Sequence, residues 1–131
     1  MSIRRAAPLA LVALLTGCGN PVHSHYSVKE TAPCLRKLGY TVDTDASKLG
    51  PVEASAPEGA LRAKEKGNAV VITFAENGGQ AKNIEAGYRR FVSKKLRPHL
   101  ADVMFSQKNV VLLWTITPPQ EELKRVLGCL R

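Results

Sequence analysis

At residues 61–74 the chain reads Leu-Arg-Ala-Lys-Glu-Lys-Gly-Asn-Ala-Val-Val-Ile-Thr-Phe. In the first half, Leu61, Ala63 and Glu65 alternate with three basic residues, and the second half is a nearly continuous apolar run. The two halves, joined by Gly67-Asn68, predict a β-hairpin with a tight turn that has glycine first. The helix-forming composition of residues 60–66 favours a helix instead, so the choice between strand and helix stays open there.

Two helices and one strand are predicted after this hairpin, and residues 103–105 are a further short strand or a turn. Asn77-Gly78-Gly79 breaks the chain, and a helix is expected over residues 80–97, with Pro98 ending it. Its buried stripe repeats at helical spacing and comprises Ile84, Tyr88, Phe91, Val92 and Leu96. The apolar run 110–116, which contains Trp114, is the best candidate for a central strand. Thr117-Pro-Pro-Gln120 has the residues of a helix start, and an amphipathic helix follows it.

A further helix is predicted before the hairpin. Either Ser27 or Thr31 caps its start, and Gly39 is a natural stop. Residues 40–42 are typical of a short strand, and residues 43–59 have the composition of an irregular surface loop. These elements predict an α+β fold over residues 27–131, a small, mostly antiparallel sheet packed against helices on one face.

Length and composition limit the protein to one ordinary basic domain. The chain has 131 residues, with 19 lysines and arginines against 11 aspartates and glutamates, a formal charge of +8. Its 44% hydrophobic share excludes wholesale disorder. No apolar run reaches the roughly 18 residues that a membrane-spanning helix needs.

The first residues have the pattern of an export signal. Arg4 and Arg5 precede an apolar stretch of about ten residues that ends at Leu15-Thr16-Gly17-Cys18. This tetrad resembles the lipobox of bacterial lipoproteins at all four positions. The alternative is a buried apolar N-terminal helix with an incidental cysteine. The rest of the chain has a loose likeness to small bacterial lipoproteins with a C-terminal cysteine-bearing helix, which supplies no activity to carry over.

The lipobox resemblance implies that residues 1–17 are a signal peptide, cleaved between Gly17 and Cys18. It also implies that Cys18 carries a diacylglycerol, usually with a further acyl group, which together give stable membrane anchoring. Residues 18–26 would form a short tether, so the domain would stay close to the bilayer. The expected location is the cell membrane or the outer membrane, on the exported side; Gly19 after the cysteine permits the outer membrane.

Two cysteines remain, Cys34 and Cys129, one near each end of the domain. In an oxidising compartment such a pair commonly forms a disulfide, which would place the first and last helices side by side. Two unlinked buried thiols are the alternative. A redox centre is disfavoured because no C-x-x-C motif is present.

The strongest candidate for a functional surface is a set of basic residues in the predicted helix 80–97. The helix carries a single acidic residue, Glu85, and six basic ones: Lys82, Arg89, Arg90, Lys94, Lys95 and Arg97. A solvated helix face explains such a set without any function. The functional interpretation is attraction to an anionic envelope polymer, to lipid head groups or to a membrane protein. Nucleic acid is not an expected partner of an exported lipoprotein.

Other motifs are weak. Asp43-Thr-Asp45-Ala-Ser47 begins like a calcium loop but lacks the required glycine and glutamate. His23 and His25 could share a metal, although no third ligand is near in sequence. Gly78-Gly79-Gln80-Ala81-Lys82 lacks the ending of a phosphate-binding loop, and nothing pairs His99 with a nucleophile.

We therefore expect no cofactor and no metal, and we assign no catalytic residue. The sequence favours a lipid-anchored envelope protein that acts as a binding or interaction module. The alternative is a small-ligand carrier or hydrolase whose site is assembled from residues distant in sequence.

Overall fold

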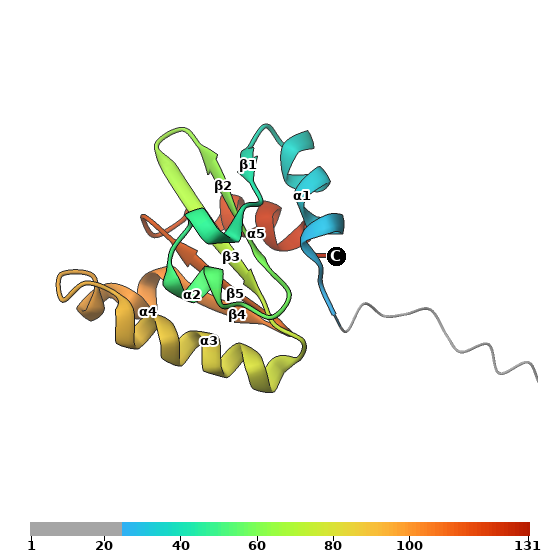
Figure 1. Ribbon diagram of the computed structural model, residues 1–131. Helices are drawn as coiled ribbons and strands as arrows, with labels where there is room; N and C mark the ends of the chain where they lie inside the picture. The colour runs from blue at the N-terminus through green and yellow to red at the C-terminus, as the bar shows by residue number, and fades with distance from the viewer. Residues whose placement is uncertain (1–24) are drawn as a thin grey trace, which may run out of the picture.

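A computed structural model describes residues 25–131 and contains a five-stranded antiparallel sheet (Figure 1). The strands are β1 (Thr41–Asp43), β2 (Ala60–Glu65), β3 (Asn68–Phe74), β4 (Met104–Gln107) and β5 (Val110–Trp114). Their order across the sheet is β1-β2-β3-β5-β4, and every neighbouring pair is antiparallel. The predicted signal peptide (residues 1–17), the predicted lipidation site Cys18, and His23 lie outside the described residues.

The helices lie on both faces of the sheet. They are α1 (Val28–Lys37), α2 (Pro51–Ala54), α3 (Gly78–Phe91), α4 (Leu100–Val103) and α5 (Gln120–Gly128), with 3-10 turns at Ala46–Lys48 and Arg97–His99. The predicted α+β class, antiparallel sheet and linked terminal helices are confirmed. Helices α1 and α5 cover one face; the structure adds α2 and α3 on the other (Figure 1). They lie there because odd-numbered residues of β3 and β5 are also apolar or small.

The hairpin at residues 60–74 is confirmed, and residues 60–65 are a strand. Glu65 pairs with Asn68, so the two-residue turn is Lys66-Gly67, with φ of 45° and 81°. Both values are positive, as a type I′ turn requires, so the prediction of Gly67-Asn68 with glycine first is wrong. Asn68 belongs to the strand instead because its side chain bonds the main-chain N–H and C=O of Ile116 at 3.0 and 3.1 Å.

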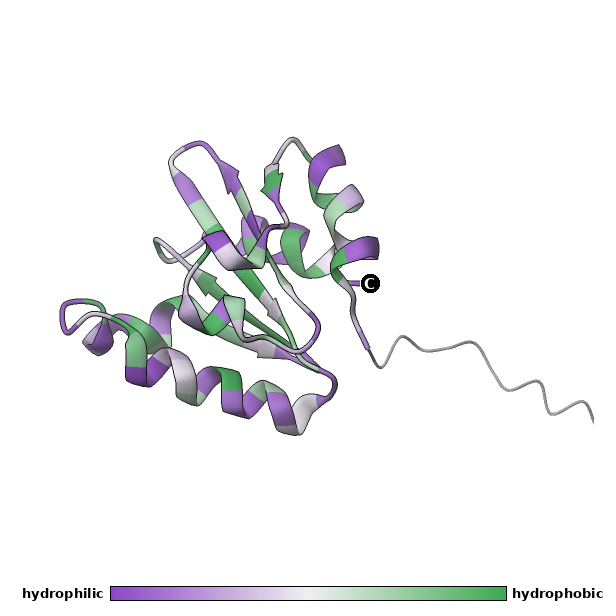
Figure 2. Ribbon diagram, viewed as in Figure 1, coloured by the Kyte–Doolittle hydropathy of each residue, from purple (hydrophilic) through white to green (hydrophobic). Residues whose placement is uncertain are grey.

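The face under α1 and α5 holds the larger core. Even-numbered residues of β3 and β5 point to it, including the fully buried Phe74 and Trp114. Figure 2 shows hydrophobic residues, in green, along the central strands of the sheet. The predicted Cys34–Cys129 disulfide joins the two helices there, with Cα atoms 5.4 Å apart. The two ends of the folded domain also meet by hydrogen bonding, because Ser27 N–H donates to the Arg131 carbonyl at 2.7 Å.

Helix α1 begins at the first of the two predicted caps. The Ser27 hydroxyl accepts a bond from Glu30 N–H, and Pro33 is accommodated inside the helix. At the other end, Gly39 has a φ of 96°, and the next N–H, that of Tyr40, bonds back to the Leu35 carbonyl at 3.1 Å. This is a Schellman ending, which needs the left-handed conformation that glycine adopts easily.

The second face carries α2 and α3, and three predictions about these regions need correction. Helix α3 ends at Phe91 rather than residue 97, because Val92 is extended and the Ser93 hydroxyl accepts from Leu96 N–H, starting a new turn. Phe91 is therefore 62% exposed and not part of the buried stripe. The segment 43–59 is not only surface loop, since Val52 is buried against the sheet.

The last helix also begins later than its sequence pattern suggests. Helix α5 starts at Gln120, and Pro119 occupies the cap position without a side-chain hydrogen bond. Thr117 is exposed and is not the cap. The predicted amphipathic character holds, because Val126 is fully buried in the larger core while Lys124 and Arg125 are exposed.

The start of the domain is held by the turn between β4 and β5. Asn109, fully buried in this turn, accepts a bond from Tyr26 N–H at 2.7 Å. Its amide also donates to the carbonyls of Tyr26 and Ala75 at 2.9 and 2.8 Å. The same turn lies beside the start of α3, where a Cβ added at Gly78 would sit 3.5 Å from the Lys108 carbonyl. The chain therefore enters the fold near the N-terminal end of α3.

Candidate functional site

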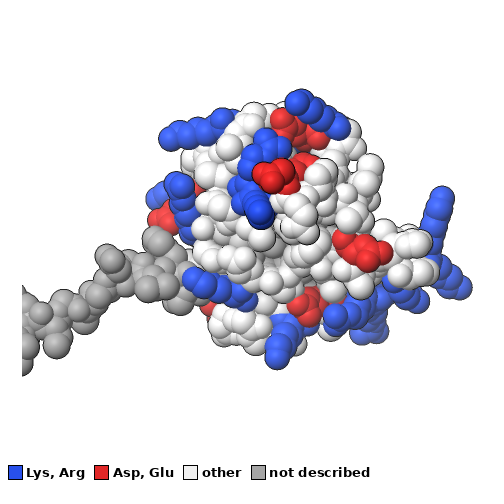
Figure 3. All heavy atoms as spheres, turned by 180° about the vertical axis from the view of Figure 1, so that it is seen from behind, with Lys and Arg blue, Asp and Glu red and all other residues white. Residues whose placement is uncertain are grey.

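The six predicted basic residues are exposed, but they do not share one helix. Lys82, Arg89 and Arg90 lie on α3, whereas Lys94, Lys95 and Arg97 lie in the irregular segment and 3-10 turn that follow. In Figure 3, basic side chains gather along the lower edge, toward the side where α3 ends. We call these six residues the basic surface. Five of the six lie at the end of α3 and in the segment that follows, and Lys82 lies near the helix start, so the basic surface is not a continuous helical stripe.

Few of these charges have a partner in the fold. Within residues 25–131, Arg89 is the only one of the six in an ion pair, at 3.7 Å from Glu85. Glu85 also accepts a hydrogen bond from Ser106. The Arg90 guanidinium lies 5.8 Å from the centre of the Phe91 ring, and that of Arg97 donates to the Val92 carbonyl at 3.5 Å. The basic surface therefore keeps most of its positive charge directed to solvent.

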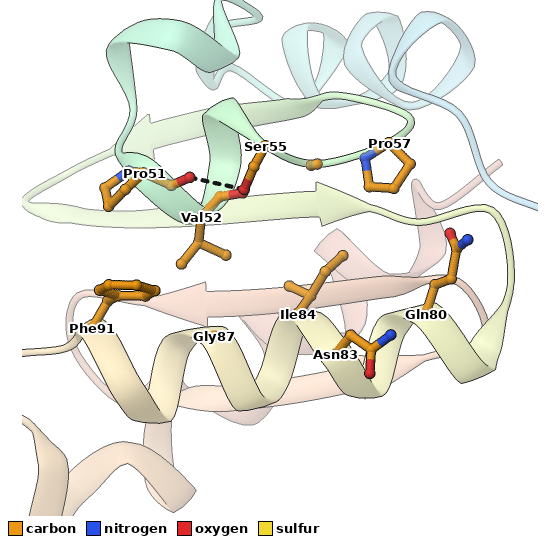
Figure 4. A pocket seen from close by; sticks show the side chains of 10 residues that line it. Pro51, Val52, Ser55, Pro57, Gln80, Asn83, Ile84, Gly87 and Phe91 are labelled. Atoms are coloured by element: carbon orange, nitrogen blue, oxygen red, sulfur yellow. Dashed lines mark hydrogen bonds between the residues drawn. The ribbon is translucent and has the colours of Figure 1, made fainter.

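A groove lies between α3 and the α2 region (Figure 4). Its volume is about 440 Å³, within the range of small-molecule sites. One wall is α2 with the residues after it, and the other is the side of α3 that carries Ile84 and Gly87. Phe91 closes one end and Gln80 the other; the full lining is Pro51, Val52, Ser55, Ala56, Pro57, Gln80, Asn83, Ile84, Gly87 and Phe91.

A buried hydrogen-bond chain holds the two walls together. The Tyr88 hydroxyl on α3 donates to the Glu53 carboxylate on α2 at 2.8 Å and lies 2.6 Å from the Thr73 hydroxyl on β3. Burial raises the pKa of Tyr88, and the Glu53 charge adds to this increase. The phenol is therefore protonated at neutral pH and can donate to Glu53. Gly87 on α3 faces Val52 on α2, where an added Cβ would make ordinary van der Waals contact at 3.5 Å.

The weaker sequence candidates have structural roles. Asn77 caps α3 by accepting from Gln80 N–H at 2.9 Å, so Gly78-Gly79 serve as a helix entry. Asp45 accepts from the Ser47 hydroxyl at 2.6 Å, and this bond lowers the pKa of Asp45. His25 and His99 are exposed at separate places in the fold. Across residues 25–131, no three His, Cys, Asp or Glu side chains are grouped closely enough to hold a metal.

The groove has no signal in the sequence that would identify it. Val52 lies in a segment whose composition is that of a surface loop, and Phe91 falls in the stripe expected to be buried. Only the packing of α2 on α3 brings the lining residues of these two helices together, because they lie 28 to 40 positions apart in the sequence. The structure provides a more useful hint, because Phe91 is exposed and lies next to Arg90. Aromatic and arginine side chains are enriched at protein–protein interfaces.

No family model, curated protein or solved structure matches this chain. Within the described part of the chain, no helix has the length and apolar character needed to cross a bilayer.

Proposed function

We propose that this protein is a lipid-anchored component of the bacterial cell envelope that acts as a binding module, and that the basic surface contacts an anionic partner. The observation that carries the proposal is the basic surface itself, six exposed cations of which one is ion-paired among the described residues. The proposed lipid anchor is Cys18, and the domain begins eight positions later at Tyr26.

The position of Tyr26 supports a second point of attachment. Tyr26 is bonded to the turn beside the start of α3, and most of the basic surface lies at the opposite end of that helix. A helix of 14 residues is about 21 Å long, so a tether at one end and cations at the other could engage the same anionic layer. Each basic residue near an anionic membrane contributes about 1 kcal/mol, which strengthens a lipid anchor without replacing it.

The anchor is tested by Cys18→Ala in a lipoprotein-producing bacterium. The variant should leave the membrane fraction or persist as an unprocessed precursor, because it lacks the thiol that would be lipidated. Membrane retention equal to that of the natural chain would contradict the proposed lipidation.

The basic surface is tested on vesicles with the full chain carrying Cys18→Ala, so that binding does not depend on acyl groups. Arg90, Lys94 and Lys95 are changed together to Glu; the matched control changes Lys29, Arg36 and Lys37 on α1, across the sheet. On vesicles with 30% phosphatidylglycerol, the first variant should bind at least about 100-fold more weakly than the control. Equal binding of both variants would show that the basic surface is not the contact.

A further inference from the structure

The groove between α2 and α3 is long and narrow. It follows α3 from Gln80 to Phe91, which at 1.5 Å per residue is about 16 Å (Figure 4). Its volume of about 440 Å³ lies within the range of small-molecule sites.

The surface that the groove offers to a ligand is mainly apolar. Its walls include Val52, Ile84 and the 62% exposed ring of Phe91. Two of its polar side chains are already bonded within the fold: the Ser55 hydroxyl to the Pro51 and Val52 carbonyls, and the Gln80 amide to Glu76. The wall formed by α3 is helical and has no free strand edge, so an extended peptide would leave backbone groups on that side without partners. An alkyl chain has no such groups to satisfy.

The two ends of the groove differ in charge. At the Gln80 end, the Glu76 carboxylate lies 3.3 Å from the Gln80 amide nitrogen. At the other end, the Arg90 guanidinium lies beside the Phe91 ring. The Glu53 carboxylate of α2 is bonded to Tyr88 and is buried. An anionic head group would therefore have the Arg90 guanidinium as a partner at the Phe91 end, whereas at the Gln80 end the Glu76 carboxylate opposes the favourable N-terminal dipole of α3.

We propose that this groove binds a linear long-chain carboxylate, with the alkyl chain lying along Ile84 and Gly87 and the carboxylate beside Arg90. The inference goes beyond the proposed function, because it requires neither a membrane surface nor an anchor. It also assigns Arg90 a role that its neighbour Arg89, ion-paired to Glu85, does not share.

The occupancy test uses decanoate below its micelle concentration and the full chain carrying Cys18→Ala, followed by isothermal titration calorimetry. Affinity should increase by about twofold for each added methylene from octanoate to dodecanoate, since each is partly removed from water. A second change, Gly87→Leu, fills the groove; a Cβ there makes ordinary 3.5 Å contact with Val52, and the site is a helix interior. Decanoate binding should then fall at least about tenfold.

A second variant keeps the test decisive if Gly87→Leu disturbs the fold. Phe91→Ala removes a wall from a side chain that is mostly exposed, so the fold should persist while decanoate binding weakens. Unchanged fluorescence of the buried Trp114 verifies the fold of both variants. Decanoate affinity that is unaltered by both changes, or independent of chain length, would overturn the proposal.

Charge recognition is tested by a matched pair, Arg90→Gln and Arg89→Gln. The first should weaken decanoate by about fivefold and leave uncharged decanol unaffected, whereas the second should change neither. Decyltrimethylammonium should bind more weakly than decanoate to the unsubstituted groove. Equal effects of the two arginine changes, or tighter binding of the cationic amphiphile, would refute the assigned orientation.

Discussion

The Cys34–Cys129 bridge should provide a large share of the stability of this domain. The perturbation is reduction of the unsubstituted protein, which breaks the bond without removing any side-chain volume. It closes a loop between residues 95 positions apart. Loop-closure entropy for that length gives a stabilisation of about 4.7 kcal/mol, acting mainly by restricting the unfolded chain.

The reduced protein should nevertheless keep its native arrangement at the chain ends. Besides the bond from Ser27 to Arg131, the Thr31 hydroxyl donates to the Arg131 carbonyl at 3.2 Å and accepts from the Arg131 N–H at 3.3 Å. Leu35 and Val126 stay buried between the two helices and the sheet. The lost free energy of unfolding therefore arises chiefly from the unfolded state, which expands when the disulfide is broken.

Urea unfolding, followed by the fluorescence of Trp114, measures this loss. Trp114 is the only tryptophan and is 1% exposed, so its emission reports the core directly. With an m-value near 2 kcal/mol/M, the midpoint should fall by about 2 M on reduction. The m-value itself should increase, because the unbridged chain exposes more surface. The double variant Cys34→Ala, Cys129→Ala gives the same comparison without reductant.

A change below about 1 kcal/mol would refute this reasoning. So would an m-value that stays the same on reduction, since the stabilisation would then arise in the folded state. Loss of native fluorescence without any urea would show instead that the terminal hydrogen bonds and the core cannot hold the ends together.

Two further predictions concern buried polar groups. Asn109→Ala removes three hydrogen bonds of 2.7 to 2.9 Å and leaves buried groups of Tyr26 and Ala75 unpaired; it should cost about 3 kcal/mol in urea unfolding, and a cost under about 0.5 kcal/mol would contradict that role. Tyr40 donates to Glu122 at 3.1 Å, and burial together with the Glu122 charge raises its pKa from 10.0 to about 12. Its phenol therefore loses a proton more readily in the unfolded chain, so the stability it gives is complete below pH 10 and is lost as the pH rises toward 12. Thermal unfolding from pH 8 to 11.5 should show a steeper decline for the natural chain than for Tyr40→Phe, and parallel curves would contradict this assignment.

Local patterns predicted most of the elements correctly. Alternation in residues 60–65 and the apolar run after it indicated the central hairpin, and Gly39 indicated where α1 ends. Cys34 and Cys129 indicated their own pairing, because only these two cysteines remain once Cys18 is assigned to the predicted lipobox. These features depend on side-chain periodicity and backbone preferences, which act over a few residues and are written directly in the sequence.

Boundaries that depend on competing local bonds were predicted less well. The turn lies at Lys66-Gly67 because Asn68 is held by Ile116, 48 residues away. Helix α3 ends at Phe91, although its apolar spacing continues to residue 96, because Ser93 starts another turn. In each case one hydrogen bond decides where the element begins or ends. The pattern of apolar residues is compatible with both the predicted and the observed boundary.

The sequence by itself supplied the set of basic residues and predicted the α+β class, the cysteine pairing and the hairpin, although it left strand and helix open over residues 60–66. Only the tertiary structure decided three further features: the packing of α2 on α3, the groove between these helices, and the exposure of Phe91 beside Arg90. The physical reason is that burial of Val52 and Glu53 depends on Tyr88, Thr73 and Gly87, which lie in other elements. No local pattern around residues 51–54 encodes that contact, because it exists only after the sheet and α3 have formed.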